Sequence, residues 1–401
     1  IDNFKNDLAE LGRYARQVGR LLDELRQMGS RSEGVATEAG GAVRVAITDR
    51  ELEPKFRAGS SVDNRILATA LECDDGQHDL QTILVTKDIN MRIRADALGL
   101  RVEDFETDRT DLSELYEGVV EIALPASEID LFYETGELSI EAGESYFPNQ
   151  FAFLRDEANP AHTALGRINL DRGVIEPLHH GRDGMWGIRP RNKEQAFAAD
   201  ILMNDDIKLI TLVGKAGTGK TLLAIAAGLQ KVTEEAVYQR LLISRPIFPL
   251  GRDIGFLPGD VEEKLTPWMQ PIYDNVEFLM GLSKADRKRG RSHQELLDLG
   301  ILEIAPLTYI RGRSIPNQFL VVDEAQNLTP HEVKTIITRV GDGTKIILTG
   351  DPYQIDNPYV DATNNGLVHT VNRFAEERIA AHITLHKGER SDLAELATNL
   401  L

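Results

Sequence analysis

The sequence contains a single cysteine, Cys73, among its 401 residues. One thiol cannot form an internal disulfide, nor can it build a zinc site made of several cysteines. Long apolar stretches are also missing, since no run approaches the roughly 18 apolar residues of a membrane span and the first residues lack the basic-then-apolar order of a signal peptide. We therefore exclude a disulfide-stapled secreted fold, expect no membrane contact, and expect a protein of the reducing cytoplasm.

Basic residues are fewer than acidic residues in this sequence. The chain has 45 Lys and Arg against 64 Asp and Glu, a formal net charge of −19. Neutralising phosphates requires Lys and Arg, so this balance argues against non-specific coating of nucleic acid, although a local basic patch is compatible with it. The length predicts two or three domains, each with its own core. The chain begins at Ile1 without Met, which we interpret as a fragment whose first element is missing.

The first 117 residues alternate between helical and strand patterns. Apolar residues recur every three or four positions over 1–28, which predicts an amphipathic helix, and 64–72 predicts a second one. The apolar, β-branched run at 82–86 predicts a buried strand, with Asp88 just beyond its end. This alternation predicts a compact α/β domain over 1–117.

The next segment, 118–185, has short alternating stretches separated by glycines and prolines, which is typical of β structure. Between 118 and 180 it holds eleven acidic and three basic residues, a net charge of −8. We interpret it as an acidic β-rich linker module, a solvated spacer rather than an active site.

From 186 onward, apolar runs alternate regularly with helical or loop stretches. They cover 207–213, 241–244, 301–305, 319–322 and 345–348, and 383–385 adds another. Continuous apolar runs of this length are typical of strands buried on both faces of a parallel sheet. The predicted fold class is α/β, with a parallel-sheet domain over 186–401.

The first of these runs leads into a complete G-x-x-x-x-G-K-T motif, which the helical stretch 222–229 follows. The motif consists of Gly214, Lys215, Ala216, Gly217, Thr218, Gly219, Lys220 and Thr221. Its glycines let backbone N–H groups face phosphates, and the helix adds its positive end. In this arrangement Lys220 contacts the β- and γ-phosphates of ATP, and Thr221 ligates Mg²⁺. The structural alternative is a glycine turn before an ordinary helix.

Two later strand ends carry polar side chains. Asp323 and Glu324 follow the run 319–322, which predicts a Mg²⁺ ligand in Asp323 and a base for the attacking water in Glu324. Gln354, in Thr349-Gly-Asp-Pro-Tyr-Gln354, follows the next strand and is our candidate for sensing the γ-phosphate. An acidic strand end and a plain Gly-Asp-Pro turn are the structural alternatives.

Together these motifs resemble the PhoH family, RecA-like ATPases related to superfamily 1 helicases. The resemblance covers 186–401 and includes three further stretches, Arg191-Asn-Lys-Glu-Gln195, Ser244-Arg245-Pro246 and Lys387-Gly-Glu-Arg390-Ser391. The first is similar to the adenine-reading Q motif, and the last is where the helicase pattern places an arginine against the γ-phosphate. The resemblance implies ATP and Mg²⁺ as cofactors, Gln195 at the adenine and Arg390 near the phosphates.

The first domain resembles a PIN nuclease domain of the kind fused to PhoH modules. The resemblance rests on Ser61-Val-Asp63-Asn64-Arg-Ile-Leu-Ala and Val85-Thr-Lys-Asp88-Ile-Asn. PIN folds gather acids at a sheet edge to bind Mg²⁺ or Mn²⁺, which activate water against an RNA phosphodiester, so Asp63 and Asp88 would be two of the metal ligands. The family's other two acids would lie before Ile1, with Asp2 a weak substitute, and we expect little nuclease activity from half a site. Taken singly, Asp63 could be a helix N-cap and Asp88 a turn residue.

RNA is the expected partner. The segment 284–291 holds five basic residues against one acidic residue and could contact phosphates, with a solvated loop as an equal alternative. Trp268 and Tyr273 could stack on bases or pack in the core. The ATPase half has room for one RecA-like domain, so the arginine that completes such a site must come from a neighbouring chain. We expect a homo-oligomer, a hexameric ring as in the PhoH family, with Arg311 or Arg313 supplied in trans.

The leading hypothesis is an ATP-dependent RNA helicase or remodelling ATPase coupled to a PIN-type ribonuclease. The alternative, from a different class, is a nucleotide-regulated scaffold or stress sensor that hydrolyses ATP slowly and neither unwinds nor cleaves RNA. A DNA-directed motor also stays open, because no motif in the sequence reads a 2′-hydroxyl.

Overall fold

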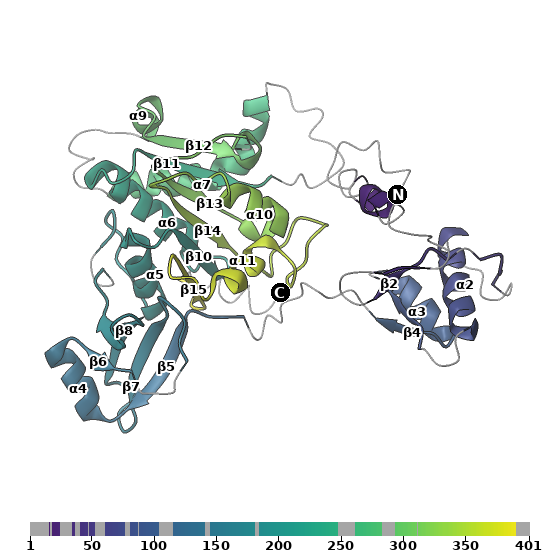
Figure 1. Ribbon diagram of the computed structural model, residues 1–401. Coiled ribbons are helices and arrows are strands. Elements are labelled where there is room, and N and C mark those ends of the chain that lie inside the picture. Colours follow the sequence, from purple (N-terminus) through teal and green to yellow (C-terminus); the bar gives the residue numbers. More distant parts are fainter. Residues whose placement is uncertain are drawn as a thin grey trace. The chain divides into compact units, whose positions relative to one another are not determined.

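The structure is a computed structural model that describes residues 16, 18–24, 34–36, 41–46, 48–52, 61–76, 81–86, 88–103, 115–140, 145–180, 184–247, 261–282, 293–310 and 312–389. The chain forms two compact units, residues 1–107 and residues 108–401 (Figure 1). Within the ranges above, none of the helices combines the length and the apolar character that crossing a membrane requires.

The first unit is a small α/β arrangement. Its elements are β1 (Val35–Ala36), β2 (Ala42–Val43), α2 (Ser61–Gly76), β3 (Ile83–Val85), α3 (Ile89–Ala97) and β4 (Arg101–Glu103). Strands β3 and β4 pair in parallel and β1 pairs with β2 in antiparallel fashion. Leu67 of α2 shares a buried core with Met91 and Ala95 of α3. Residues 18–24 are helical, as their periodicity predicts.

Strand β3 differs from the predicted buried strand. The side chains of Ile83 and Val85 are 39% and 49% exposed, whereas Leu84 between them packs against the core. Successive side chains of a strand point to opposite faces, so helices that cover only one face leave alternate residues exposed. The strand is confirmed, and its complete burial is wrong.

The second unit is built on a six-stranded sheet. Its strands are β10 (Leu209–Gly214), β11 (Arg240–Arg245), β12 (Leu302–Pro306), β13 (Gln318–Val322), β14 (Lys345–Gly350) and β15 (Ala380–Leu385). They lie in the order β12-β11-β13-β14-β10-β15, and every neighbouring pair is parallel. The predicted α/β fold with a parallel sheet is confirmed, and each predicted run corresponds to one strand.

Helices cover both faces of this sheet (Figure 1). One core includes residues of α5 (Lys193–Met203), α6 (Lys220–Leu229), α7 (Val261–Leu282) and α9 (His293–Asp298), and α6 continues into a π-helical turn, Gln230–Glu234. The opposite core includes α10 (Pro330–Ile337) and α11 (Gly366–Phe374). Along β11, Leu241 and Ile243 enter the first core and Leu242 the second. Burial on both faces is why these strands are continuously apolar.

The acidic module is a five-stranded sheet with one helix. It contains β5 (Val119–Leu124), α4 (Ala126–Thr135), β6 (Leu138–Ser139), β7 (Phe151–Asp156), β8 (Thr163–Asn169) and β9 (Val174–Pro177), with the strands in the order β5-β7-β8-β9-β6. Ile129 and Phe132 of α4 pack with Leu154 and Ala164 of the sheet in a core of their own.

This module packs against the domain built on the six-stranded sheet. The ring of Phe151 in β7 stacks on that of Phe197 in α5, with centroids 4.5 Å apart. Asn149 Nδ2 donates hydrogen bonds to the carbonyl oxygens of Arg378, at 2.9 Å, and Ala380, at 2.8 Å. The interpretation of this segment as a solvated spacer is therefore wrong. The sheet face opposite α4 buries Phe151 against Phe197 of the large domain.

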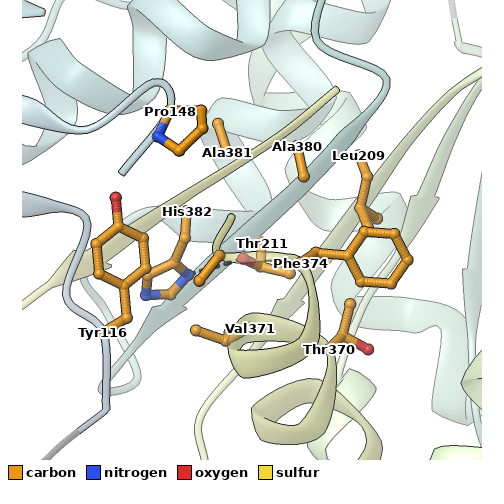
Figure 2. A pocket seen from close by; sticks show the side chains of 11 residues that line it. Tyr116, Pro148, Leu209, Thr211, Thr370, Val371, Phe374, Ala380, Ala381 and His382 are labelled. Carbon is orange, nitrogen blue, oxygen red and sulfur yellow. Dashed lines mark hydrogen bonds between the residues drawn. The ribbon is translucent and has the colours of Figure 1, made fainter. Parts of the chain in front are cut away.

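The chain enters this module along the edge of the large sheet. Glu117 O accepts a hydrogen bond of 3.0 Å from Thr384 N, and Tyr116 lies beside His382 of β15 (Figure 2). The His382 ring is hydrogen-bonded through Nδ1 to Thr211 Oγ1 at 2.7 Å. Burial lowers the pKa of His382 to about 3, so the ring is neutral and part of the core. The adjoining cavity, of about 10 Å³, has room for no more than one water molecule.

Candidate active site

The phosphate loop connects β10 to α6 at the carboxyl edge of the parallel sheet. Gly214, where β10 ends, has φ 156°, and a Cβ there would lie 2.3 Å from the carbonyl oxygen of Leu385. Gly219, just before α6, has φ 93° in the left-handed region that favours glycine. The glycines of the motif are therefore required by the close approach and turn of the loop.

Lys220 reaches back over this loop. Its side chain is buried, and Nζ donates to the carbonyl oxygens of Gly214, at 2.5 Å, and Lys215, at 3.0 Å. The N-terminus of α6 already favours an anion at the loop. The ammonium group adds a full positive charge at the same point.

A hydroxyl and a carboxylate meet beside the loop. Thr221 Oγ1 donates to Asp323 Oδ1 at 2.7 Å, and Thr349 Oγ1 donates to the same oxygen at 2.6 Å. Asp323 is only 5% exposed, so this carboxylate is held in one orientation. Hydroxyl and carboxylate oxygens are the ligands that Mg²⁺ prefers, and the contact between Thr221 and Asp323 fits their holding one ion together.

Glu324 follows Asp323 with its backbone in the left-handed region, at φ 54°. Its Oε2 accepts a 2.6 Å hydrogen bond from Gln326 Nε2, and its Oε1 lies 3.4 Å from a guanidinium nitrogen of Arg245. Burial and the neighbouring charge of Asp323 raise the pKa of Glu324, while Gln326 and Arg245 act in the opposite direction. A carboxylate with these opposing influences is suited to accept a proton from water.

Gln326 also connects this carboxylate to the loop after β14. Gln326 Nε2 donates to Gln354 O at 2.8 Å, and its Oε1 accepts from Asp351 N at 3.1 Å. Asn327 next to it accepts from Asp356 N at 2.7 Å. The strand end that carries Glu324 and the loop that carries Gln354 are thus joined by buried side chains.

Gln195 supports the phosphate loop from α5. Its Nε2 donates to Thr218 O at 3.0 Å, and its Oε1 accepts from Arg191 N at 2.9 Å. Asn192 caps α5 and donates through Nδ2 to Glu389 Oε1 at 2.9 Å. The Oε1 and Nε2 atoms of Gln195 are therefore both hydrogen-bonded to backbone groups. The role of Gln195 in recognising adenine stays a prediction.

These groups border one cavity of about 370 Å³. Its lining comes from the phosphate loop, the first turn of α6, the end of β14, the segments that follow β13, β14 and β15, and one residue of α7. The residues are Ala216, Gly217, Gly219, Lys220, Thr221, Leu222, Asn275, Asp323, Glu324, Gly350, Asp351, Gln354 and Glu389. Lys220, Thr221, Asp323, Glu324 and Gln354, which were predicted from separate motifs, all line this cavity, although their roles stay predictions.

The predicted PIN ligands lie on separate elements of the first unit. Asp63 is in the first turn of α2. Asp88 is the N-cap of α3, and its Oδ1 accepts a 3.1 Å hydrogen bond from Met91 N. Within the part of the chain that the structure describes, no three His, Cys, Asp or Glu side chains gather closely enough to hold a metal ion. Asp88 thus has a capping role in the helix, and its metal role stays a prediction.

Arg313, Trp268 and Tyr273 do not line this cavity. Arg313 is held away from it by Glu303, with Nη1 2.6 Å from Oε1. Trp268 and Tyr273 are both half-buried on α7. Arg311, Arg390 and the basic segment 284–291, together with Asp2, lie outside the described residues.

The sequence analysis gave no role to three side chains that contact the predicted ones. Arg245, Thr349 and Gln326 each lie at or just beyond the carboxyl end of a parallel strand and touch Asp323 or Glu324. These residues could have been found from the sequence as polar residues that follow successive predicted strands. The carboxyl ends of parallel strands meet at the same edge of a sheet, so such residues lie near one another.

Comparisons with known proteins match both units. A family model described as "PhoH-like protein" matches residues 187–400, and one described as "PIN domain" matches residues 1–106. "Protein PhoH2" from Bacillus subtilis (strain 168) is 46% identical over 411 residues, covering 100% of this chain and 92% of that protein. "Protein PhoH2" from Mycolicibacterium smegmatis is 34% identical, covering 98% of this chain and 87% of that protein. A crystal structure of Pif1 helicase from Candida albicans is 15% identical, with a TM-score of 0.28, and the match covers 53% of this chain and 43% of that chain.

Proposed function

Because the chain belongs to the PhoH-like protein family and carries a PIN domain ahead of the PhoH domain, we propose that it hydrolyses ATP with Mg²⁺ to unwind or remodel RNA. The observation that carries the ATPase proposal is the contact of Thr221 Oγ1 with Asp323 Oδ1, at 2.7 Å. It lies beside the buried Lys220 in a cavity that Glu324 also borders. A metal-binding pair, a phosphate-binding cation and a base in one cavity are the parts that ATP hydrolysis requires.

Each residue has a distinct chemical task. Thr221 and Asp323 would hold Mg²⁺, which supplies charge neutralisation of the β- and γ-phosphates. Lys220 would bind phosphate oxygens, and Gln354 would orient the γ-phosphate. Glu324 would accept a proton from water as the water oxygen bonds to the γ-phosphorus in line. The bond from that phosphorus to the β–γ bridging oxygen breaks, and ADP leaves with this oxygen.

The PIN domain supports a second proposed activity, cleavage of RNA. Asp63 and Asp88 would contribute carboxylates to a Mg²⁺ or Mn²⁺ site that activates water against a phosphodiester. The support is the match of residues 1–106 to the PIN domain. The ATPase would then deliver unfolded RNA to a nuclease in the same chain.

The proposed active form is a homo-oligomer, a hexameric ring with RNA as its partner. A single RecA-like domain leaves one side of the nucleotide for a neighbouring chain to complete. Arg313, which is exposed and paired with Glu303, and Arg311 are the candidates for that contribution, with Arg390 supplied in cis. Native mass spectrometry with ATP and Mg²⁺ tests the assembly, and a monomer under these conditions would contradict it.

The ATPase rate with and without single-stranded RNA tests the function. We expect RNA to stimulate wild type, Lys220→Ala to abolish hydrolysis, and the exposed-lysine control Lys334→Ala to match wild type. Hydrolysis without RNA stimulation would instead favour the nucleotide-regulated scaffold or stress sensor. Strand displacement on matched RNA and DNA duplexes separates an RNA motor from a DNA motor.

A further inference from the structure

A second cavity, of about 320 Å³, adjoins the start of the phosphate loop. It is lined by residues of the loop, of the turn after β14, of the end of β15 and of the entry segment, namely Leu115, Glu117, Val213, Gly214, Lys215, Asp351, Pro352, Tyr353, Thr384, Leu385 and His386. The nucleotide cleft borders the later part of the same loop, and Asp351 borders both cavities. Of the motif residues, Gly214 and Lys215 line this second cavity, whereas Lys220 and Thr221 line only the nucleotide cleft.

The walls of this cavity combine an apolar floor with a polar rim. Val213 and Leu385 are buried beneath it. At the rim, Tyr353 is 70% exposed, and Lys215 is also exposed. A large aromatic side chain left in water beside a cavity provides a stacking surface that the fold itself does not use.

The carboxylates narrow the class of ligand. Glu117 and Asp351 both line the cavity, and a phosphate group placed inside would meet these two carboxylates. Asp351 Oδ1 also accepts a 3.1 Å hydrogen bond from Tyr353 N, and Glu117 Oε1 lies 3.5 Å from His386 Nε2. A nucleobase instead presents amino and imino N–H groups, which can donate hydrogen bonds to carboxylate oxygens. Its phosphate would stay outside, where Lys215 is exposed. The volume is at the lower end of small-ligand sites, which suits one base and excludes a duplex.

We propose that this cavity holds one base of single-stranded RNA, stacked on Tyr353, with the adjacent phosphate neutralised by Lys215. Stacking on an aromatic ring is the common way in which proteins hold single strands without reading their sequence. The proposal rests on the proposed RNA function and assigns the place on the ATPase domain where the strand is held.

A buried hydrogen-bond network connects this cavity to the hydrolytic site. Gln326, which is fully buried, accepts from Asp351 N and donates to Gln354 O, so it holds the turn on both sides of Tyr353. The same amide donates to Glu324 Oε2. A base seated against the turn acts on the orientation of Glu324 through one side chain, which gives RNA a route to stimulate hydrolysis.

Binding of a fluorescent single-stranded RNA to the full chain, measured by anisotropy, tests the proposal. We expect Tyr353→Ala to raise Kd about 5-fold or more, and Tyr353→Phe to stay within about 2-fold of wild type, because stacking needs the ring and not the hydroxyl. Tyr133→Ala removes another exposed tyrosine, on α4, and should leave Kd unchanged. As a second measurement, RNA containing 4-thiouridine should crosslink to the peptide that carries Tyr353.

The outcomes separate this inference from the proposed function. If wild type binds no RNA, the proposed function fails and the cavity assignment falls with it. If wild type binds RNA and Tyr353→Ala binds it equally well, the cavity assignment alone is overturned. A loss of affinity for a fluorescent ATP analogue as large as the loss for RNA would also overturn it, since the cavity would then belong to the nucleotide. A wild-type crosslink that maps to a peptide other than the one carrying Tyr353 would likewise overturn the cavity assignment.

Discussion

Gln326 Nε2 lies 2.6 Å from Glu324 Oε2 and donates a hydrogen bond to it. The same nitrogen donates to Gln354 O, so one amide orients both the proposed base and the proposed γ-phosphate sensor. Buried polar groups that lose their partner become costly, and small displacements of reacting groups lower rates strongly.

We expect Gln326→Leu to lower kcat for ATP hydrolysis by about 10- to 100-fold. The reason is that Glu324 loses the donor that fixes its carboxylate. Gln318→Leu is the matched control, because Gln318 begins β13 and its Oε1 has no hydrogen bond within the described chain. Steady-state kinetics of both variants check this, and equal rates would show that the amide does not position the base.

Replacing the proposed base itself should separate binding from hydrolysis. Glu324→Gln keeps the shape of the side chain but removes its capacity to take a proton from water. We expect ATP affinity within a few-fold of wild type and a hydrolysis rate about 100-fold or more lower. Equilibrium binding and single-turnover hydrolysis measure the two quantities, and unchanged turnover would remove Glu324 from its assigned role.

Lys345 makes the stability of the second unit depend on pH. It is fully buried, and Nζ donates to Ile201 O at 2.9 Å and Asn204 O at 2.6 Å. Burial lowers its pKa from 10.5 to about 7. Between these values the unfolded chain binds more protons than the folded chain, so the stability contributed by this lysine rises with pH.

We therefore expect wild type to gain stability relative to Lys345→Met as the pH rises from about 7 to about 9. Urea unfolding followed by tryptophan fluorescence reports this, because Trp186 and Trp268 both belong to the second unit. A difference between the two proteins that does not change with pH would show that Lys345 keeps its proton in the folded state.

Gly118 is the point at which the entry segment passes the edge of the large sheet. Its φ is 82°, and a Cβ there would lie 2.0 Å from the carbonyl oxygen of His382. We expect Gly118→Ala to destabilise the second unit by about 1 to 3 kcal/mol. Gly281→Ala, in α7 with nothing within 4 Å of its Cβ position, should be neutral or slightly stabilising. Equal unfolding midpoints for the two variants would contradict the steric argument.

Two substitutions at Asp88 separate its helix-capping role from its proposed metal role. Asn retains a side-chain oxygen for Met91 N, whereas Ala removes it and costs about 1 kcal/mol of helix stability. We expect Asp88→Asn to fold like wild type yet to lose the metal-dependent RNA cleavage, however low, that wild type shows, and ATPase activity to be unaffected by either change. Thermal unfolding and a cleavage assay with Mg²⁺ or Mn²⁺ measure these effects. If Asp88→Asn cleaves RNA as well as wild type does, Asp88 has no metal role and acts only as the N-cap of α3.

The parallel sheet could be predicted because its strands are buried on both faces and are therefore continuously apolar in sequence. Lys220 and Thr221 could be assigned because the motif, its strand and its helix are contiguous. Gln326 could not, because its partners Glu324, Asp351 and Gln354 come from two strand ends whose side-chain directions depend on packing. The exposed side chains of Ile83 and Val85 were missed for the converse reason, since a β-branched apolar run does not show whether one face or both will be covered.

Local chemistry was determined by the sequence alone: the phosphate loop, the paired acids after β13, the α/β class and the family. Contacts between distant segments were decided only by the tertiary structure. It packed the acidic segment against α5, buried Lys345 under helix-end carbonyls and placed Tyr353 beside a cavity next to the phosphate loop. The physical reason is that a motif acts through covalent neighbours, whereas burial and side-chain pairing depend on which surfaces meet after folding.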